Sequence, residues 1–327
     1  MLKPWRKVLM VIFLTVTLLW TGSGDYRPTA LDLAVAPNKY SVVNWEASHF
    51  LDKWVRKLRD ILPWNAEPSR HEKIVQVREF FNLGVEMRSL ERRVQFPERS
   101  TGGILSEAEI REIWGEIERI EERRRKIQPR VEETIESEIS AVLSQEGFSS
   151  RIGVIFPPVD AVFTKSPRVL ILSPRDRIER LKTILLGPGL SDQEREQLEG
   201  LIFREENLSA LVAGTGGVAA YPSVVSDSGG LRHTLEITAH EWLHHWWFFQ
   251  PLGQHFWDST QMTTLNETAA TLGGQEIGDR ALMAMTGEQV SREPPLPVSE
   301  DHGAFDFREA MHETRLRTGE LLAQRMI

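Results

Sequence analysis

The chain has 327 residues, of which 41% are hydrophobic and 26% charged, a composition typical of a globular protein with room for two domains. A formal net charge of −8 argues against nucleic acid as a main partner, because phosphate binding needs a basic surface. The absence of cysteine excludes disulfides, a lipid-modified cysteine anchor and thiolate metal ligands.

The first 24 residues are typical of a targeting segment. Lys3, Arg6 and Lys7 precede the apolar residues 8–20, and no further charge occurs until Asp25. Residues 1–24 are therefore expected to be a signal peptide or a membrane anchor. We expect a single-pass protein of the cell membrane with its catalytic part outside the cytoplasm, or a secreted protein if the segment is cleaved.

A helical region is expected after a polar linker at residues 25–40. Within residues 41–150, apolar residues recur at helical spacing over 41–62 and 72–94. A third helix begins at the capping box Ser106-x-x-Glu109 and runs past Pro129 to Val142. Its apolar stripe is expected to pack within a helical hairpin, with a coiled-coil partner surface as the alternative.

From residue 151 the composition becomes rich in β-formers. Short strands are expected at 152–156, 160–163 and 168–172, and helices at 178–186 and 191–207, the second capped by Ser191. The glycine-rich stretch Gly214-x-Gly216-Gly217 leads into extended residues up to 222. It is no phosphate loop, because no Lys-Ser/Thr pair follows it.

The most informative motif is His240-Glu241-x-x-His244, in a segment that is expected to be helical. Two histidines four residues apart lie on one face of a helix, where both imidazoles can reach one zinc ion. Glu241 is turned about 100° from His240 and can act as a general base on a zinc-bound water. The alternative, a core helix without a metal, would bury three polar side chains at high cost. His245 is expected to be a packing residue or to support the site indirectly.

The third ligand separates the zinc peptidase classes. Trp247 and Gln250 stand where the metzincin pattern needs glycine and histidine, which excludes that class. Asn266-Glu267, on a predicted following helix, resembles the gluzincin zinc peptidases, which include thermolysin-like enzymes and zinc aminopeptidases. The resemblance covers about a fifth of the chain. It implies that His240, His244 and Glu267 are ligands and that Glu241 is the base.

Thermolysin-like enzymes also carry an aspartate four residues after the third ligand, where it orients a ligand histidine. Here that position is Thr271. Either Asp258, Asp279 or a backbone carbonyl does this, or Glu267 is not the ligand. Glu276 is the second choice, because Gly273-Gly274 is expected to end the helix before it.

The resemblance also implies an edge strand above the zinc that pairs with substrate backbone. Residues 216–222 are the candidate, with Gly217, Ala219 and Tyr221 as substrate-binding residues; an ordinary hairpin is the alternative. His312 is a candidate catalytic residue for the oxyanion or a substrate carboxylate, although it lies on what could be a solvated charged face. His302 and Tyr221 are further candidates for the oxyanion.

The sequence thus predicts an α+β, zincin-like catalytic domain at 151–327, with a small mixed sheet over the motif helix and an α-helical region before it. Its expected function is hydrolysis of peptide bonds in a peptide or protein substrate, through a zinc-activated water with Glu241 as the base. A non-peptide amide substrate is also compatible. The alternative is a non-catalytic, membrane-anchored helical scaffold with a degenerate metal site. Four of the ten tryptophans, Trp242, Trp246, Trp247 and Trp257, are expected to wall the cleft and pack the core.

Overall fold

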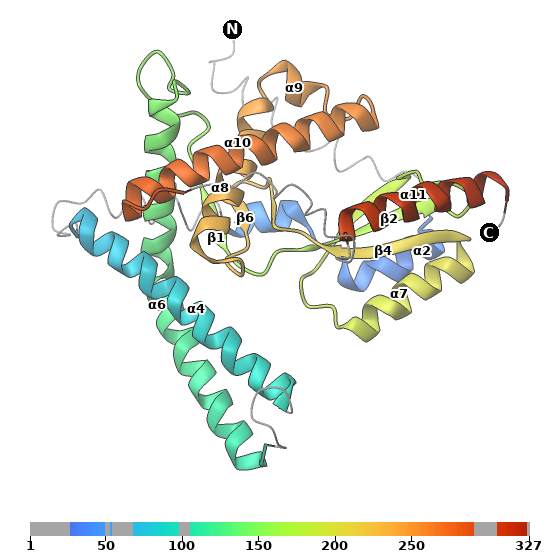
Figure 1. Cartoon of the computed structure of the whole chain (residues 1–327), viewed down its shortest axis with the longest axis horizontal. Helices are drawn as coiled ribbons and strands as arrows, with labels where there is room; N and C mark the ends of the chain where they lie inside the picture. The colour runs from blue at the N-terminus through green and yellow to red at the C-terminus, as the bar shows by residue number, and fades with distance from the viewer. Residues whose placement is uncertain (1–26, 50–52, 54–67, 98–104, 291–305, 326–327) are drawn as a thin grey trace, which may run out of the picture.

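A computed structural model describes residues 27–49, 53, 68–97, 105–290 and 306–325. These residues form a mixed α and β structure, mostly helical with two small sheets (Figure 1), which is compatible with the predicted α+β class. The helices are α2 (Ala30–Val35), α4 (Arg70–Gln95), α6 (Glu107–Gln145), α7 (Asp192–Glu205), α8 (Gly230–Trp247), α9 (Pro251–Gln254), α10 (Thr260–Thr286) and α11 (Phe307–Ala323), with a 3-10 turn η1 (Ala36–Asn38). Residues 42–49 are also helical. The strands are β1 (Ala161–Phe163), β2 (Arg168–Pro174), β3 (Lys182–Leu186), β4 (Leu208–Gly214), β5 (Gly217–Val218) and β6 (Ser223–Val225).

Helices α4 and α6 form a long hairpin that extends from the body of the molecule (Figure 1). Each helix begins with a capping box, at Ser69 and at Ser106, which satisfies backbone N–H groups that the first turn leaves free. Near the tip, Leu90, Ile113, Ile117 and Ile120 form a small core of their own. The predicted helices at 72–94 and 106–142 are confirmed, and the apolar stripe packs within the hairpin.

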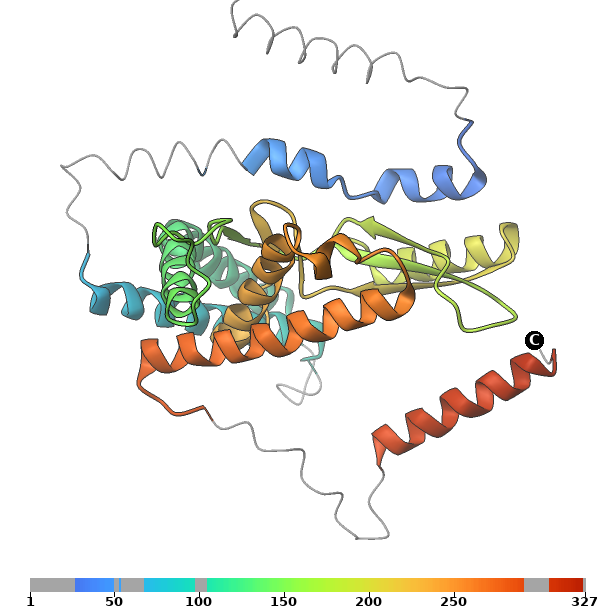
Figure 2. The same ribbon diagram turned by 90° about the horizontal axis from the view of Figure 1, so that it is seen from above.

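The strands form two three-stranded sheets, and the one that contains β5 and β6 contacts α8. In the order β1-β6-β5, β1 pairs parallel with β6 and β5 pairs antiparallel with it, so this sheet is mixed. In the order β3-β2-β4 all pairs are antiparallel. Residues 42–49 and α2 lie on one side of α8, and α10 lies on the other (Figure 2). The motif helix is therefore held between layers rather than at the surface.

Three predicted elements differ from the structure. Residues 152–156 form a turn instead of a strand, with Gly153 at φ +78° and Ile152 exposed. The helix predicted at 178–186 is replaced by a loop and strand β3, because Ile184 and Leu186 alternate into the core with the period of a strand. Helix α10 continues through Gly273-Gly274 and ends only at Gly287, a left-handed cap at φ +74°.

The main core unites the helical region with the rest of the chain. Val77 and Phe80 of α4 and Ile135 of α6 pack in one cluster with Trp242 of α8 and Ile277 of α10. The expected boundary near residue 150 therefore does not separate two cores.

The segment expected to be a linker also contributes to the packing. It carries α2, whose Leu31 and Val35 are buried against β2, β3, β4 and α7. Close to it in sequence, Lys53 is buried and pairs with Glu136 and with Asp160 at 2.7 Å, and its ammonium group also donates to the carbonyl of Ala161. These contacts tie the N-terminal part of the chain to α6 and β1.

Within the described ranges, no helix is both long enough and apolar enough to cross a membrane. This finding goes against the single-pass membrane localisation expected from the sequence, which is accordingly corrected and not carried further. Residues 1–24, from which that expectation came, lie outside the described residues.

Candidate metal centre

Helix α8 places both motif histidines on one face. The Nε2 atoms of His240 and His244 lie 3.1 Å apart, with the two rings nearly perpendicular and their centroids 4.8 Å from each other. The helix is fixed beneath them by the buried side chains of Leu235, Ala239 and Trp242. The two nitrogens therefore point at one position above the helix.

Glu267 on α10 completes the group. Its Oε2 atom lies 3.6 Å from Nε2 of His240 and 3.7 Å from Nε2 of His244. Helix α10 can come this close because of its glycines. A Cβ atom on Gly274 would lie 2.8 Å from the carbonyl oxygen of Glu236, and one on Gly278 would lie 2.7 Å from the backbone nitrogen of Glu236. Gly274, one of the two glycines that were expected to end the helix, and Gly278 instead let α10 pack directly on the backbone of α8.

These three donors fit a zinc ion. Ligand atoms about 2.0–2.1 Å from a tetrahedral zinc lie about 3.3–3.4 Å from one another, close to the three separations observed. Two imidazoles and a carboxylate are a ligand set used at catalytic zinc sites. Among the described residues, these are the only three His, Asp or Glu side chains that gather in this way, so a bound ion would keep an open position.

Backbone groups of α10 lie next to the motif histidines. The backbone of Ala270, one turn after Glu267, faces His240 and helps to raise its pKa. Asp279 and Asp258, the other candidates, are engaged elsewhere: Asp279 with Arg232 and Asp258 with His255. Of the three candidates named from the sequence, the backbone of α10 is therefore the one that faces a motif histidine.

Asn266 supports the site from beneath. It is 1% exposed, and its amide nitrogen donates to the carbonyl of Leu252 at 3.1 Å, which ties α10 to α9. Its amide oxygen is buried on the side of His244. In the sequence, Asn266 was noted only as part of the Asn266-Glu267 pair. Its burial next to His244 indicates that it helps to position that side chain.

Glu241, the predicted base, lies beside the three donors, on the same helix as the two histidines. The residue is only 6% exposed. Gly217 of β5 lies directly over it: a Cβ atom on Gly217 would be 2.5 Å from Oε1 of Glu241 and 2.7 Å from the carbonyl of Val224. The edge strand of the mixed sheet thus passes over the candidate base with only a glycine between them.

Comparisons of this chain with models of protein families, with curated proteins and with solved structures found no match.

Burial sets the protonation of the group. Burial raises the pKa of Glu241 to about 7. The charge of His240 opposes this rise, and the negative charge of Glu267 adds to it. Burial lowers the pKa of His244 to about 4, helped by the charge of His240. His244 is therefore neutral at neutral pH, which is the form that binds metals.

His240 and Glu267 interact as a pair. Burial opposes protonation of His240, but its close contact with Glu267 and the negative charges of Glu241 and Glu267 outweigh this and raise its pKa. The same contact lowers the pKa of Glu267. The carboxylate of Glu267 is therefore ionised at neutral pH.

The predicted substrate-binding residues lie on one side of the site. Gly217 is in β5, an edge strand, as predicted for part of 216–222. Ala219 is exposed just after it, and the ring of Tyr221 lies edge-on to His245, 5.5 Å between centroids. Burial lowers the pKa of His245. Its ring contact with Tyr221 links α8 to the connection between β5 and β6.

His312 and Glu276 are not part of the metal group. His312 is exposed on α11, which stands apart from α8 in Figure 2, and His302 lies outside the described residues. Glu276 pairs with Arg280 on the surface of α10. Trp257, expected in the cleft wall or core, is 86% exposed, whereas Trp242 is fully buried.

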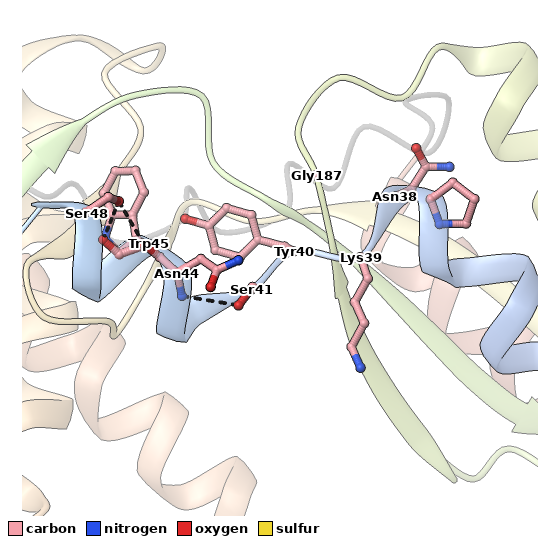
Figure 3. Close-up of a pocket in the computed structure, with 9 residues that line it drawn as sticks. Asn38, Lys39, Tyr40, Ser41, Asn44, Trp45, Ser48 and Gly187 are labelled. Carbon is pink, nitrogen blue, oxygen red and sulfur yellow. Dashed lines mark hydrogen bonds between the residues drawn. The ribbon is translucent and has the colours of Figure 1, made fainter. Parts of the chain in front are cut away.

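A separate hollow lies between the helical residues 42–49 and Gly187, next to strand β3 (Figure 3). Tyr40, Asn44 and Trp45 line one side of it. The lining contains no acid and no histidine, and the pKa of Tyr40 is raised by burial to about 12. The hollow therefore lacks a group for acid–base chemistry near neutral pH and does not include the metal group.

Proposed function

We propose that this protein is a zinc-dependent peptidase of gluzincin type with a zincin-like catalytic core. The observation that carries the proposal is the convergence of His240, His244 and Glu267, whose donor atoms are 3.1 to 3.7 Å apart, beside the buried carboxylate of Glu241. Zn²⁺ is the proposed cofactor, and a peptide or protein is the proposed substrate. The chain's acidic charge argues against a nucleic acid substrate.

A zinc ion held by these ligands supplies a Lewis acid that polarises a substrate carbonyl and makes water easier to deprotonate. Glu241 accepts a proton from the water as its oxygen attacks the carbonyl carbon. Glu241 then gives the proton to the amine nitrogen as the carbon–nitrogen bond breaks. A carboxylate with a pKa near neutral suits both steps, and a cation nearby would lower that pKa and favour the basic form.

The mixed sheet offers a way to align a peptide. Strand β5 is at the edge of its sheet, and it passes over Glu241. A substrate in extended conformation could pair with this edge and bring its carbonyl carbon to the base.

The test combines metal analysis with peptide cleavage. We expect about one zinc per chain and cleavage of a peptide library that stops on chelation. Glu241→Gln should keep the zinc but hydrolyse at least about 100-fold more slowly, since it loses the proton acceptor and no ligand. His244→Ala should lose both zinc and activity.

Three results would contradict the proposal. Protein that takes up no zinc on titration would exclude the cofactor. Loss of zinc in Glu241→Gln would make Glu241 a ligand and overturn its role as base. Zinc binding with no hydrolysis of any peptide or amide would instead favour a non-catalytic scaffold.

A further inference from the structure

An aromatic surface borders the metal centre, next to the exposed pair His255 and Asp258. Residues 246–257, from the end of α8 through α9, contain no acid, lysine or arginine, and residues 152–158 contain none either. Five aromatic side chains from these segments form what we call the aromatic rim: Phe156, Phe248, Phe249, Phe256 and Trp257. Phe248 is 71% and Trp257 86% exposed. Exposed apolar groups gathered in this way mark binding surfaces more often than chance.

The rim begins at a metal ligand. The ring centroid of His244 lies 6.1 Å from that of Phe256, which in turn lies 4.6 Å from Trp257. Phe248 follows His244 by one helical turn and so lies on the same face of α8. The ring centroids of Phe248 and Phe249 lie 5.2 Å apart, and those of Phe249 and Phe156 lie 5.6 Å apart.

The backbone that carries the rim is held firmly. A Cβ atom on Gly253 would lie 2.2 Å from the carbonyl oxygen of Trp247, so α9 packs against the end of α8 without a side chain between them. The hydroxyl of Thr263 donates to the carbonyl of Phe256 at 2.8 Å, and Asn266 holds Leu252. Phe248 and Trp257 are therefore exposed on a backbone that is held in place. Covering them with an apolar group would remove apolar surface from water, which is favourable.

We propose that the aromatic rim binds an apolar segment of the polypeptide substrate that flanks the scissile bond. This inference rests on the proposed peptidase function. A permanent partner or a second copy of the chain on the rim would also cover His244 and close the metal centre. An apolar stretch of the substrate is the occupant compatible with an active centre, and the lack of charge along 246–257 favours it over a charged one.

The test uses two peptides that share the residues around the cleaved bond. One carries Leu, Val and Phe in its flanks, and the other carries Ser, Asn and Gln. We expect the zinc-loaded full chain to show a kcat/KM about tenfold or more higher for the apolar peptide. The double variant Phe248→Ser/Trp257→Ser should bring the ratio close to one. Trp114→Ser, at a half-exposed tryptophan on the α4–α6 hairpin, is the matched control and should leave the ratio unchanged.

The outcomes separate this inference from the proposed function. A ratio near one in the wild type, or a ratio that survives the double variant, would overturn the role of the rim and leave the peptidase intact. Zinc-loaded protein that cleaves neither peptide would overturn the peptidase itself. If the double variant instead loses binding to phosphatidylcholine vesicles and keeps the peptide ratio, the rim is a lipid-binding surface and the inference is wrong.

Discussion

The two helix pairs of this protein, α4–α6 and α8–α10, are built in opposite ways. In the hairpin, Ile113, Ile117 and Ile120 of α6 make an apolar stripe that packs against α4, while charged side chains cover the rest. The α8–α10 pair buries polar residues, among them Thr238, Glu241 and Asn266, and makes contact through glycine. The hairpin is stabilised by a pattern that each helix carries on its own. The second pair depends on the fit between two backbones.

The difference follows from what each pair has to do. Apolar stripes bring helices together with side chains between them, at interaxial distances of about 8–10 Å. A carboxylate on α10 must reach two imidazoles on α8, and glycines at the crossing bring the backbones close enough. A small displacement of α10 would therefore harm the metal group more than it harms stability.

The largest expected effect is at the third ligand. Glu267→Ala should weaken zinc binding by more than about 100-fold, beyond what loss of a supporting residue causes. Glu276→Ala, on the same helix and paired with Arg280 at the surface, should change zinc affinity less than about twofold. Competition with a chelator of known affinity measures both. A larger effect at Glu276 would make it the ligand and remove the basis of the gluzincin assignment.

A core substitution in the hairpin should affect stability alone. Ile117 is 4% exposed, and Ile117→Ala should destabilise the protein by about 2–4 kcal/mol through the cavity it leaves. Chemical denaturation gives the change in free energy of unfolding. Zinc affinity, measured on folded protein, should stay at the wild-type value. A weaker zinc site in this variant would mean that the two helix pairs are coupled.

Adjacent glycines provide the matched comparison within α10. Gly274→Ala should push α10 from α8, costing about 1–3 kcal/mol of stability and weakening zinc binding, because the added methyl group meets backbone atoms of Glu236 and His240. At Gly273 the same group meets only Cδ1 of Leu243, a side chain that can move. Equal zinc affinities in the two variants would show that the close approach of the helices does not position Glu267.

The smallest effect is expected at the cap of α6. Ser106→Ala should destabilise by about 1 kcal/mol near neutral pH. Hydrogen bonds from the side chain and backbone of Ser106 lower the pKa of Glu109 in the folded state. The stabilisation that comes from ionised Glu109 is fully present above its unfolded pKa of about 4.3. It is lost as the pH falls through the lower pKa that Glu109 has in the folded protein. The difference between variant and wild type, measured by denaturation at a series of pH values, should therefore shrink in acid.

Much of the candidate site was predictable because its signals are local. The spacing of His240, Glu241 and His244 requires only that the segment be helical. Glu267 could be named from a motif, and the structure brings it to both histidines. Gly217 was predicted on an edge strand and lies on one. His312 was predicted from its position on a helical face, but nothing local could place α11, which the structure leaves away from the site.

The errors came from residues whose meaning depends on a neighbour. Gly273-Gly274 predicts a helix end when the chain is considered alone, and here it allows a helix crossing. Residues 182–186 have an apolar content that suits a helix or a strand, and pairing with β2 made them a strand. The carbonyl of Ala270 could not be identified from the sequence, because every residue has one and only packing selects which one faces His240.

The sequence by itself determined the capping boxes, the stripe of the hairpin and the pair of histidines, since each depends on residues within one or two helical turns. Only the tertiary structure decided that α10 crosses α8 backbone to backbone, that Gly217 lies over Glu241, and that Phe248 and Trp257 remain exposed beside the metal group. These features depend on distances between segments far apart in the chain. Such distances are fixed by the packing of the whole core, which a local pattern does not encode.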